Sequence, residues 1–486
     1  MTLNSTPAAN AEETSVSLTI PTRPPQHRKH ARKHALKHAL KHALKHAPPG
    51  SPLLIASLVA LACTSGEKGS GEQAIAAAAC ADSGSGITLP AGFCATVFAD
   101  SIGHARQIVV APNGDVYVNT WSGPYYQRSP APPGGFLVAL RDTNSDGRAD
   151  VVQRFGETSE NKGTGGVGLA LYNGALFAEA GPRILRYTLD ATAMAPAADP
   201  DTVIVALPTD GDHPQHSMAI DSSGNLYIQS GSASNSCQIK ERTAESKGKD
   251  PCRELETRGG VWRYDAKVNG QRFSPKERFA TGIRNAVGMT IGPDGALWTT
   301  QHGRDQLAEN WPKLYTPEQG QQLPAEELMR VSEGDDYGWP YCYYDGEQKK
   351  RVLAPEYGGD GGTAVGRCAD KQEPVATFPA HWAPNAVVFY TGTQFPERYR
   401  GGAFVAFHGS WNRTPGPQGG YNVVFQPMAG GKASGGHEVF ADGFAGATVQ
   451  PDRATYRPAG VAMGRDGALY VTDDVKGRVW RITYGN

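Results

Sequence analysis

The sequence predicts an all-β fold, a six-bladed β-propeller with long inter-strand loops, because one phrase recurs along it. An alternating apolar run, a glycine-containing turn and a second apolar run repeat, and Asn-Gly or Asp-Gly tolerates the positive φ of a tight hairpin. Six copies predict six blades. Their mean spacing of roughly 70 residues, against about 40–50 in a standard propeller, predicts long loops. Five clear copies begin at Ile108, Leu169, Met218, Met289 and Val461, and a weaker one surrounds Gly401-Gly402.

Composition favours one large domain over residues 87–486. The chain contains 59 glycines and 35 prolines, and its formal net charge is −1. Charges of both signs are interspersed in this part, so nucleic-acid binding has little electrostatic support. No apolar run in it reaches the length of a membrane span.

The first 63 residues predict an export region. A basic run that repeats Lys-His-Ala-Leu precedes an apolar segment from Pro52 to Ala62. Such a segment is short for a membrane helix and typical of an export signal. The basic run is either a repetitive flank of that signal, translation from an upstream start codon, or a His-rich metal-binding tract. Residues 64–86 are predicted to form a flexible linker. We expect an exported, periplasmic protein, with Cys63 either lipidated as a membrane anchor or discarded with the signal.

The other six cysteines form three pairs that are close in sequence. An exported chain favours disulfides, and each pair would close a local loop. The expected bridges are Cys80–Cys94, Cys237–Cys252 and Cys342–Cys368.

Polar residues gather in loops beside the repeated phrases. An Asp-His pair ending in His213 precedes the third copy, and a loop histidine is a candidate general base. His216 is its rival. Arg284-Asn285 precedes the fourth copy and suits an anionic or carbonyl-bearing ligand. Gln301-His-Gly-Arg-Asp305 follows that copy, and Tyr337-Gly-Trp-Pro340 comes later.

In this order, the motifs resemble the soluble glucose and sorbosone dehydrogenase family, most closely the sorbosone-dehydrogenase-like branch. Members are six-bladed propellers that carry pyrroloquinoline quinone (PQQ) and calcium. Gly-Ile-Arg-Asn and Tyr-Gly-Trp-Pro are the most specific matches. The branch also has stretches like Ser234-Asn-Ser-Cys237 and Ala406-Phe-His-Gly-Ser-Trp-Asn-Arg413.

The resemblance implies roles for individual residues. His213 matches the catalytic base. Arg284 and Asn285 match the pair that contacts the quinone and the reacting oxygen, and Arg284 would stabilise negative charge there. Arg457 matches an arginine that pairs with cofactor carboxylates, and Arg413 is expected to bind the cofactor as the substitute for a lysine that the glucose-oxidising members have on the penultimate blade.

Calcium is expected at two places. The resemblance implies that the backbone carbonyls of the Gly303-Arg304 turn hold a catalytic calcium. Separately, an acidic loop spaces its oxygen ligands like an EF-hand but has Gln153 at the twelfth position. The alternative for this loop is a hairpin capped by its own side chains. Its candidate ligands are Asp142, Asn144, Asp146, Arg148 and Asp150.

The favoured interpretation is a PQQ-dependent oxidoreductase that oxidises an aldose or a related polyol or aldehyde. The cofactor would perform the redox step while the protein orients it. The electrons would pass to an acceptor such as a cytochrome. Two alternatives stay open: a propeller lactonase or esterase, and a non-catalytic propeller binding module that has lost the cofactor.

Overall fold

The computed structural model describes residues 85–120, 133–156, 166–190 and 192–485. The chain divides into two compact units, Met1–Ala74 and Ile75–Asn486. The first unit, with the predicted export region and Cys63, lies outside the described residues.

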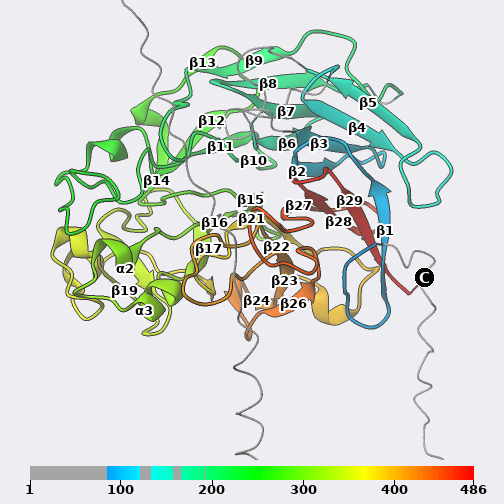
Figure 1. Ribbon diagram of the computed structural model, residues 1–486. Coiled ribbons are helices and arrows are strands. Elements are labelled where there is room, and N and C mark those ends of the chain that lie inside the picture. The colour runs from blue at the N-terminus through cyan, green and yellow to red at the C-terminus, as the bar shows by residue number, and fades with distance from the viewer. Residues whose placement is uncertain (1–84, 121–132, 157–165, 191, 486) are drawn as a thin grey trace, which may run out of the picture. The chain divides into compact units, whose positions relative to one another are not determined.

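The second unit contains six sheets, each with four antiparallel blade strands, arranged around a common centre (Figure 1). This confirms the predicted six-bladed β-propeller. From the innermost strand outwards, the first three blades are β2 (Ala105–Val110), β3 (Val116–Thr120), β4 (Leu137–Arg141) and β5 (Val151–Phe155); β6 (Leu169–Tyr172), β7 (Ala175–Ala180), β8 (Arg183–Thr188) and β9 (Asp201–Val205); and β10 (Met218–Ile220), β11 (Asn225–Ser230), β12 (Gly260–Asp265) and β14 (Arg278–Thr281). The others are β15 (Met289–Ile291), β16 (Leu297–Gln301), β17 (Glu326–Val331) and β20 (Ala376–Phe378); β21 (Pro384–Phe389), β22 (Ala403–Phe407), β23 (Asn422–Gln426) and β26 (Glu438–Ala441); and β27 (Pro458–Met463), β28 (Leu469–Asp473), β29 (Val479–Tyr484) and β1 (Phe93–Ala99).

Each repeated phrase forms the two inner strands of a blade. The turn at Asn173-Gly174 shows why the phrase contains these residues. Both have positive φ, 47° and 74°, and Tyr172 pairs directly with Ala175 across the turn. A two-residue hairpin with positive φ at both positions strongly favours Asn-Gly.

The N-terminal strand closes the ring. β1 pairs antiparallel with β29, so the last blade takes strands from both ends of the domain. The ring of Phe93 in β1 packs edge-on against Phe395 and Phe440, with centroids 4.8 Å and 4.9 Å away. These contacts attach β1 to the fifth blade as well, and closure of the ring leaves only short, protected strand edges.

The core lies between adjacent blades. Val261 of β12 and Met329 of β17 belong to one buried cluster that joins the third and fourth blades. The innermost strands contact one another around the ring, from β2 through β6, β10, β15, β21 and β27 back to β2. Close packing of this kind holds the inner ends of all six blades in fixed positions.

Insertions extend from this core. The strand β13 (Gln271–Arg272) adds to β9, and the described helices are short. No helix among the described residues is long and apolar enough to cross a membrane. The inserted elements are α2 (Leu307–Asn310), α3 (Pro317–Gln322), β18 (Cys342–Asp345), β19 (Lys350–Leu353), β24 (Met428–Ala429), β25 (Lys432–Ala433) and the 3-10 helices η2 (Arg253–Glu256), η3 (Pro275–Glu277), η4 (Pro355–Tyr357), η5 (Gly366–Cys368) and η6 (Glu397–Tyr399).

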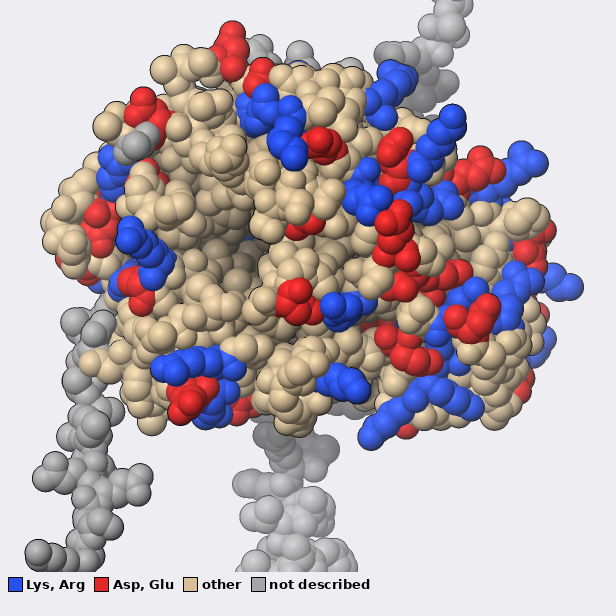
Figure 2. Space-filling model, turned by 180° about the vertical axis from the view of Figure 1, so that it is seen from behind, with Lys and Arg blue, Asp and Glu red and all other residues tan. Residues whose placement is uncertain are grey.

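Two of the three predicted disulfides are confirmed. Cys237 bonds to Cys252, and Cys342 bonds to Cys368. Cys94 is also disulfide-bonded, while its predicted partner Cys80 lies outside the described residues. On the face shown in Figure 2, basic and acidic side chains are intermixed around a hollow.

Candidate active site

The propeller topology brings the predicted site loops to one end of the ring. In an antiparallel pair, the start of the first strand and the end of the second lie side by side. The backbone N–H of His302, after β16, accordingly donates to the carbonyl of Asn285, before β15, at 3.0 Å. The N–H of His408, after β22, likewise donates to the carbonyl of Ala383, before β21, at 2.9 Å.

These loops enclose a cavity of about 590 Å³, within the ~300–1,000 Å³ typical of small-molecule sites. Its polar wall is rich in arginine, histidine and carboxylate groups. The lining residues are Arg106, Gly211, Asp212, His213, Pro214, Gln215, Arg242, Arg284, Asn285, Val287, His302, Gly303, Asp305, Glu326, His381, Ala383, Asn385, His408, Gly409, Trp411, Asn412 and Arg457.

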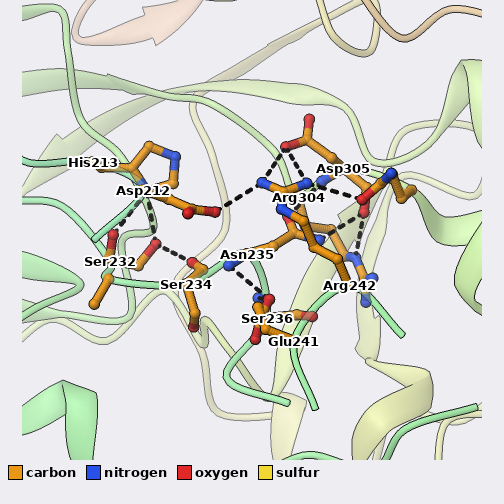
Figure 3. Close-up of polar contacts among 12 residues, drawn as sticks. Asp212, His213, Ser232, Ser234, Asn235, Ser236, Glu241, Arg242, Arg304 and Asp305 are labelled. Atoms are coloured by element: carbon orange, nitrogen blue, oxygen red, sulfur yellow. Dashed lines mark hydrogen bonds and ion pairs between the residues drawn. The ribbon is translucent and has the colours of Figure 1, made fainter. Parts of the chain in front are cut away.

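His213 lies in this cavity with one ring nitrogen fixed. Its Nδ1 is 2.9 Å from both the carbonyl oxygen and the hydroxyl of Ser232, which is visible in Figure 3. Because a protonated Nδ1 donates to that carbonyl, Nε2 is the nitrogen left to accept a proton. Burial and the nearby Arg284 cation lower the pKa of His213 well below 6.5. The imidazole is therefore neutral near pH 7, as a general base must be.

The rival histidine has a different environment. His216 is fully buried, and its Nδ1 lies 2.9 Å from Glu179, whose same oxygen also accepts from the His216 backbone N–H at 3.0 Å. His216 does not line the cavity. Its contacts join the loop before β10 to the second blade.

Arg284 is held by the protein on every side. Its Nε donates to the carbonyl of Asn235 at 3.0 Å, and its Nη2 donates to the Asn235 side chain and to Asp305 at 2.9 Å and 3.0 Å. Its Nη1 donates to the carbonyl of Gly303 at 2.8 Å and more weakly to that of His302 at 3.4 Å. All five N–H groups thus have acceptors, so Arg284 orders the cavity wall in addition to carrying charge.

Asn285 lies beside Arg284 with an acceptor still available. Its amide nitrogen is 3.4 Å from Nδ1 of His302. Its Oδ1 is buried and has no hydrogen-bond partner among the described residues. A buried unpaired carbonyl of this kind costs free energy unless a ligand donates to it.

The Gly303 turn lines the cavity and is anchored by a carboxyl group. The N–H of Gly303 donates to Glu326 at 2.8 Å, and burial raises the pKa of Glu326 to about 8. The Arg304 side chain is buried away from the cavity in an ion pair with Glu356 at 2.6 Å. This turn therefore presents its backbone to the cavity at Gly303.

The two arginines predicted to bind the cofactor, Arg457 and Arg413, differ in position. Arg457 lines the cavity, donating from Nε and Nη2 to the carbonyls of His408 and Gly409, each at 2.9 Å. No carboxylate among the described residues forms an ion pair with it. Arg413 does not line the cavity and instead donates to the carbonyls of Gln321 and Ala380 at 2.7 Å and 2.9 Å. The structure thus supports a cavity position for Arg457 and not for Arg413.

Two further arginines line the cavity that the motifs did not identify. Arg106 pairs with the buried Asp474 at 2.5 Å, and His408 contacts the same carboxylate at 2.9 Å. Burial and the Arg457 charge lower the pKa of His408 to about 4. Arg242, in the loop closed by the Cys237–Cys252 bridge, pairs with Asp212 at 2.8 Å and with Asp305 at 3.4 Å (Figure 3).

The acidic loop between β4 and β5 lies outside the cavity. Asp142 accepts from the N–H groups of Ser145 and Gly147 at 2.7 Å and 2.8 Å, and Asp146 accepts from that of Arg148 at 2.8 Å. Asp150 bonds Thr143, and Asn144 accepts from the N–H of Asp146 at 3.0 Å. Both a self-capped hairpin and a calcium loop place side-chain oxygens near backbone N–H groups, so the calcium assignment stays a prediction.

The described His, Cys, Asp and Glu residues hold one group of three ligand atoms within 4.8 Å of one another. It consists of Cys237, Cys252 and Glu254, and both cysteines are used in the disulfide.

The fold and the cavity together define a six-bladed propeller with an arginine-rich ligand-binding site at one end of the ring. The family model described as TrAA12-like matches residues 87–485. The chain belongs to this family, which confirms the resemblance noted from the sequence.

Individual relatives are distant. A "pyrroloquinoline quinone-dependent pyranose dehydrogenase" of Coprinopsis cinerea is 28% identical over 236 residues, covering 41% of this chain and 30% of the relative. An uncharacterized protein of Borreliella burgdorferi is 27% identical over 221 residues, covering 43% of this chain and 49% of the relative. The chain therefore matches less than half the length of these relatives.

Solved structures of other proteins share the fold. The calcium structure of a Trichoderma reesei family AA12 protein has a TM-score of 0.65 at 18% identity, covering 82% of this chain and 97% of the other. The holo form of the pyranose dehydrogenase PQQ domain from Coprinopsis cinerea has a TM-score of 0.63 at 18% identity, with the same coverage.

Proposed function

We propose that this protein is a PQQ-dependent oxidoreductase that acts on an aldose or a related polyol or aldehyde. The observation that carries the proposal is the pairing, in one cavity, of a neutral anchored His213 with Arg457, a cation without a carboxylate partner among the described residues. The family membership and the pyranose dehydrogenase relative support it.

The cavity fits such a cofactor in its donor and acceptor chemistry. PQQ carries three carboxylates, and Arg457 is positioned to bind one through a charge-assisted hydrogen bond. The unpaired Asn285 oxygen supplies an acceptor. When bound, an ortho-quinone of this kind accepts the hydride from the substrate carbon.

The protein's own contribution is acid–base chemistry and orientation. His213 would take the hydroxyl proton of the substrate at Nε2, while Ser232 keeps the ring in place through Nδ1. Arg284 would add positive charge near the reacting oxygen and hold Asp305 and the Gly303 turn. The backbone carbonyls of Gly303 and Arg304 are proposed to bind calcium, which requires the Gly303 carbonyl to give up the hydrogen bond that it accepts from Arg284 at 2.8 Å in this structure.

Location and electron transfer are parts of the same proposal. The two described disulfides suit an oxidising compartment, which supports an exported, periplasmic protein with or without a lipid at Cys63. A soluble acceptor such as a cytochrome would take the electrons.

No observation favours the alternative functions. A propeller lactonase would centre a metal on inward-facing carboxylates. Among the described cavity residues, no three carboxylate or histidine side chains bring ligand atoms within 4.8 Å of one another. A binding module without cofactor would have no use for the neutral, anchored His213.

The test is reconstitution. PQQ and calcium are added to the purified protein, and dye-linked oxidation of an aldose panel is measured together with PQQ binding by absorbance titration. We expect activity only with PQQ, lost on chelation and restored by calcium. Tight PQQ binding without oxidation of any aldose would refute the substrate class, and no PQQ binding would refute the dehydrogenase.

A further inference from the structure

Trp411 is an exposed aromatic residue in the wall of the cavity. Its side chain is 54% exposed, although it lines the same cavity as His213. A single exposed apolar residue is common on protein surfaces. A large aromatic at the rim of a polar cavity is less easily explained by packing.

The loop that carries Trp411 is fixed on both sides. Before it, the Ser410 hydroxyl donates to Gln418 at 2.6 Å, and the Tyr421 hydroxyl donates to the Ser410 carbonyl at 2.7 Å. After it, Arg413 donates to the carbonyls of Gln321 in α3 and of Ala380 after β20. The indole is therefore presented to solvent by a preorganised loop, which reduces the entropy lost when a ligand binds.

The residue after Trp411 supplies an unused acceptor. The amide nitrogen of Asn412 donates to Asp305 at 2.8 Å, which fixes the side-chain orientation. Asn412 is one of the residues that line the cavity, and its buried Oδ1 has no hydrogen-bond partner among the described residues. A ligand hydroxyl is the donor that fits this position.

An exposed indole, in the residue next to a fixed acceptor, matches the chemistry of a pyranose ring. The C–H bonds on one face of such a ring can pack on the electron-rich face of an aromatic side chain. The hydroxyls at its edge donate hydrogen bonds. Neither a nucleotide phosphate nor a carboxylate would use the Asn412 oxygen, because both lack a donor.

We propose that Trp411 and Asn412 form a saccharide-binding subsite at the rim of the cavity, in which a pyranose ring stacks on Trp411 and donates a hydroxyl to Asn412 Oδ1. This inference rests on the proposed function and assigns the residues that orient its substrate.

The test measures saccharide affinity directly. D-glucose, D-galactose, D-xylose and cellobiose are titrated into the full chain, with and without PQQ and calcium, by calorimetry and by tryptophan emission. The variants are Trp411→Ala and Trp411→Phe. The control is Val268→Ala, which changes a side chain that is 47% exposed but does not line the cavity.

We expect at least one of the sugars to bind to the wild type. Trp411→Ala should bind that sugar about tenfold more weakly, which is a change of about 1.4 kcal/mol in the free energy of binding. Trp411→Phe should keep most of the affinity and lose the sugar-induced emission change. Val268→Ala should match the wild type.

Unchanged affinity in Trp411→Ala, or no binding of any of the four sugars to the wild type, would overturn the subsite. The proposed function fails separately. Sugar binding that depends on Trp411, without PQQ-dependent oxidation, would refute the dehydrogenase and support the subsite. PQQ-dependent oxidation with unchanged sugar affinity in Trp411→Ala would support the dehydrogenase and refute the subsite.

Discussion

Replacing His213 separates catalysis from folding. His213→Gln removes the proton acceptor but keeps an amide that can donate to the Ser232 carbonyl, so the loop should stay in place. Loss of a general base typically lowers turnover by about 100- to 10,000-fold. The structural cost is at most one net hydrogen bond, about 1 kcal/mol. PQQ affinity should change little, because the base acts on the substrate hydroxyl.

The matched control is His216→Gln, three residues away. His216 contacts the buried Glu179 through both its ring and its backbone. Glutamine has no ring to fill this fully buried site, and where its amide does not reach Glu179 the buried carboxyl group loses a donor, at a cost of roughly 1–3 kcal/mol. His216→Gln should therefore unfold at a lower temperature, while the folded protein keeps near-normal turnover.

The assay is dye-linked turnover against pH, combined with thermal unfolding. Because burial and Arg284 hold the pKa of His213 well below 6.5, activity of the wild type should persist below pH 6.5 before the base is protonated. Near-full turnover in His213→Gln, with an inactive but folded His216→Gln, would show that the base has been assigned to the wrong histidine. An acid limit at or above pH 6.5 would contradict the electrostatic reasoning.

Three further predictions concern the cofactor, a disulfide and pH stability. Arg457→Ala should weaken PQQ binding about 10- to 100-fold in an absorbance titration, because a charge-assisted hydrogen bond is worth about 1.5–3 kcal/mol; unchanged affinity would exclude the carboxylate contact. Replacing Cys237 and Cys252 by serine should lower the free energy of unfolding, measured in denaturant, by about 2–4 kcal/mol. The loop that carries Arg242 should also show faster hydrogen exchange. A loss of less than about 1 kcal/mol would contradict a stabilising role for this disulfide. The pKa of His408 in the folded state is lowered to about 4, so the unfolded state takes up this proton first as pH falls from about 6.5 to 4. The free energy of unfolding should therefore decline across that window by at most about 3 kcal/mol. A His408→Asn variant that keeps the full wild-type decline would contradict the role given to His408.

Much of the fold could be predicted from the sequence because its determinants are local. Asn173-Gly174 specifies a hairpin by backbone conformation alone, and each repeated phrase contains its own turn and both strands. Antiparallel pairing then places the loop before each inner strand beside the loop after its partner. This is why motifs as distant in sequence as His213 and Arg457 could be expected at one mouth.

The tertiary structure decided the rest. Closure of the ring by β1 and β29 depends on contacts between the two ends of the domain, for which the repeated phrase carries no signal. Arg242 and Arg106 reach the cavity because of Asp212, Asp305 and Asp474, which are distant from them in sequence or on other blades.

Arg413 is a residue that the sequence predicted to bind the cofactor and that the tertiary structure directs elsewhere. Its motif places it in a loop at the mouth, but two backbone carbonyls, of Gln321 and Ala380, accept its hydrogen bonds and draw it away from the cavity. A sequence motif determines which residues a loop offers. Which of them face the ligand depends on the acceptors that neighbouring blades bring within hydrogen-bond distance, and those are set only when the ring has closed.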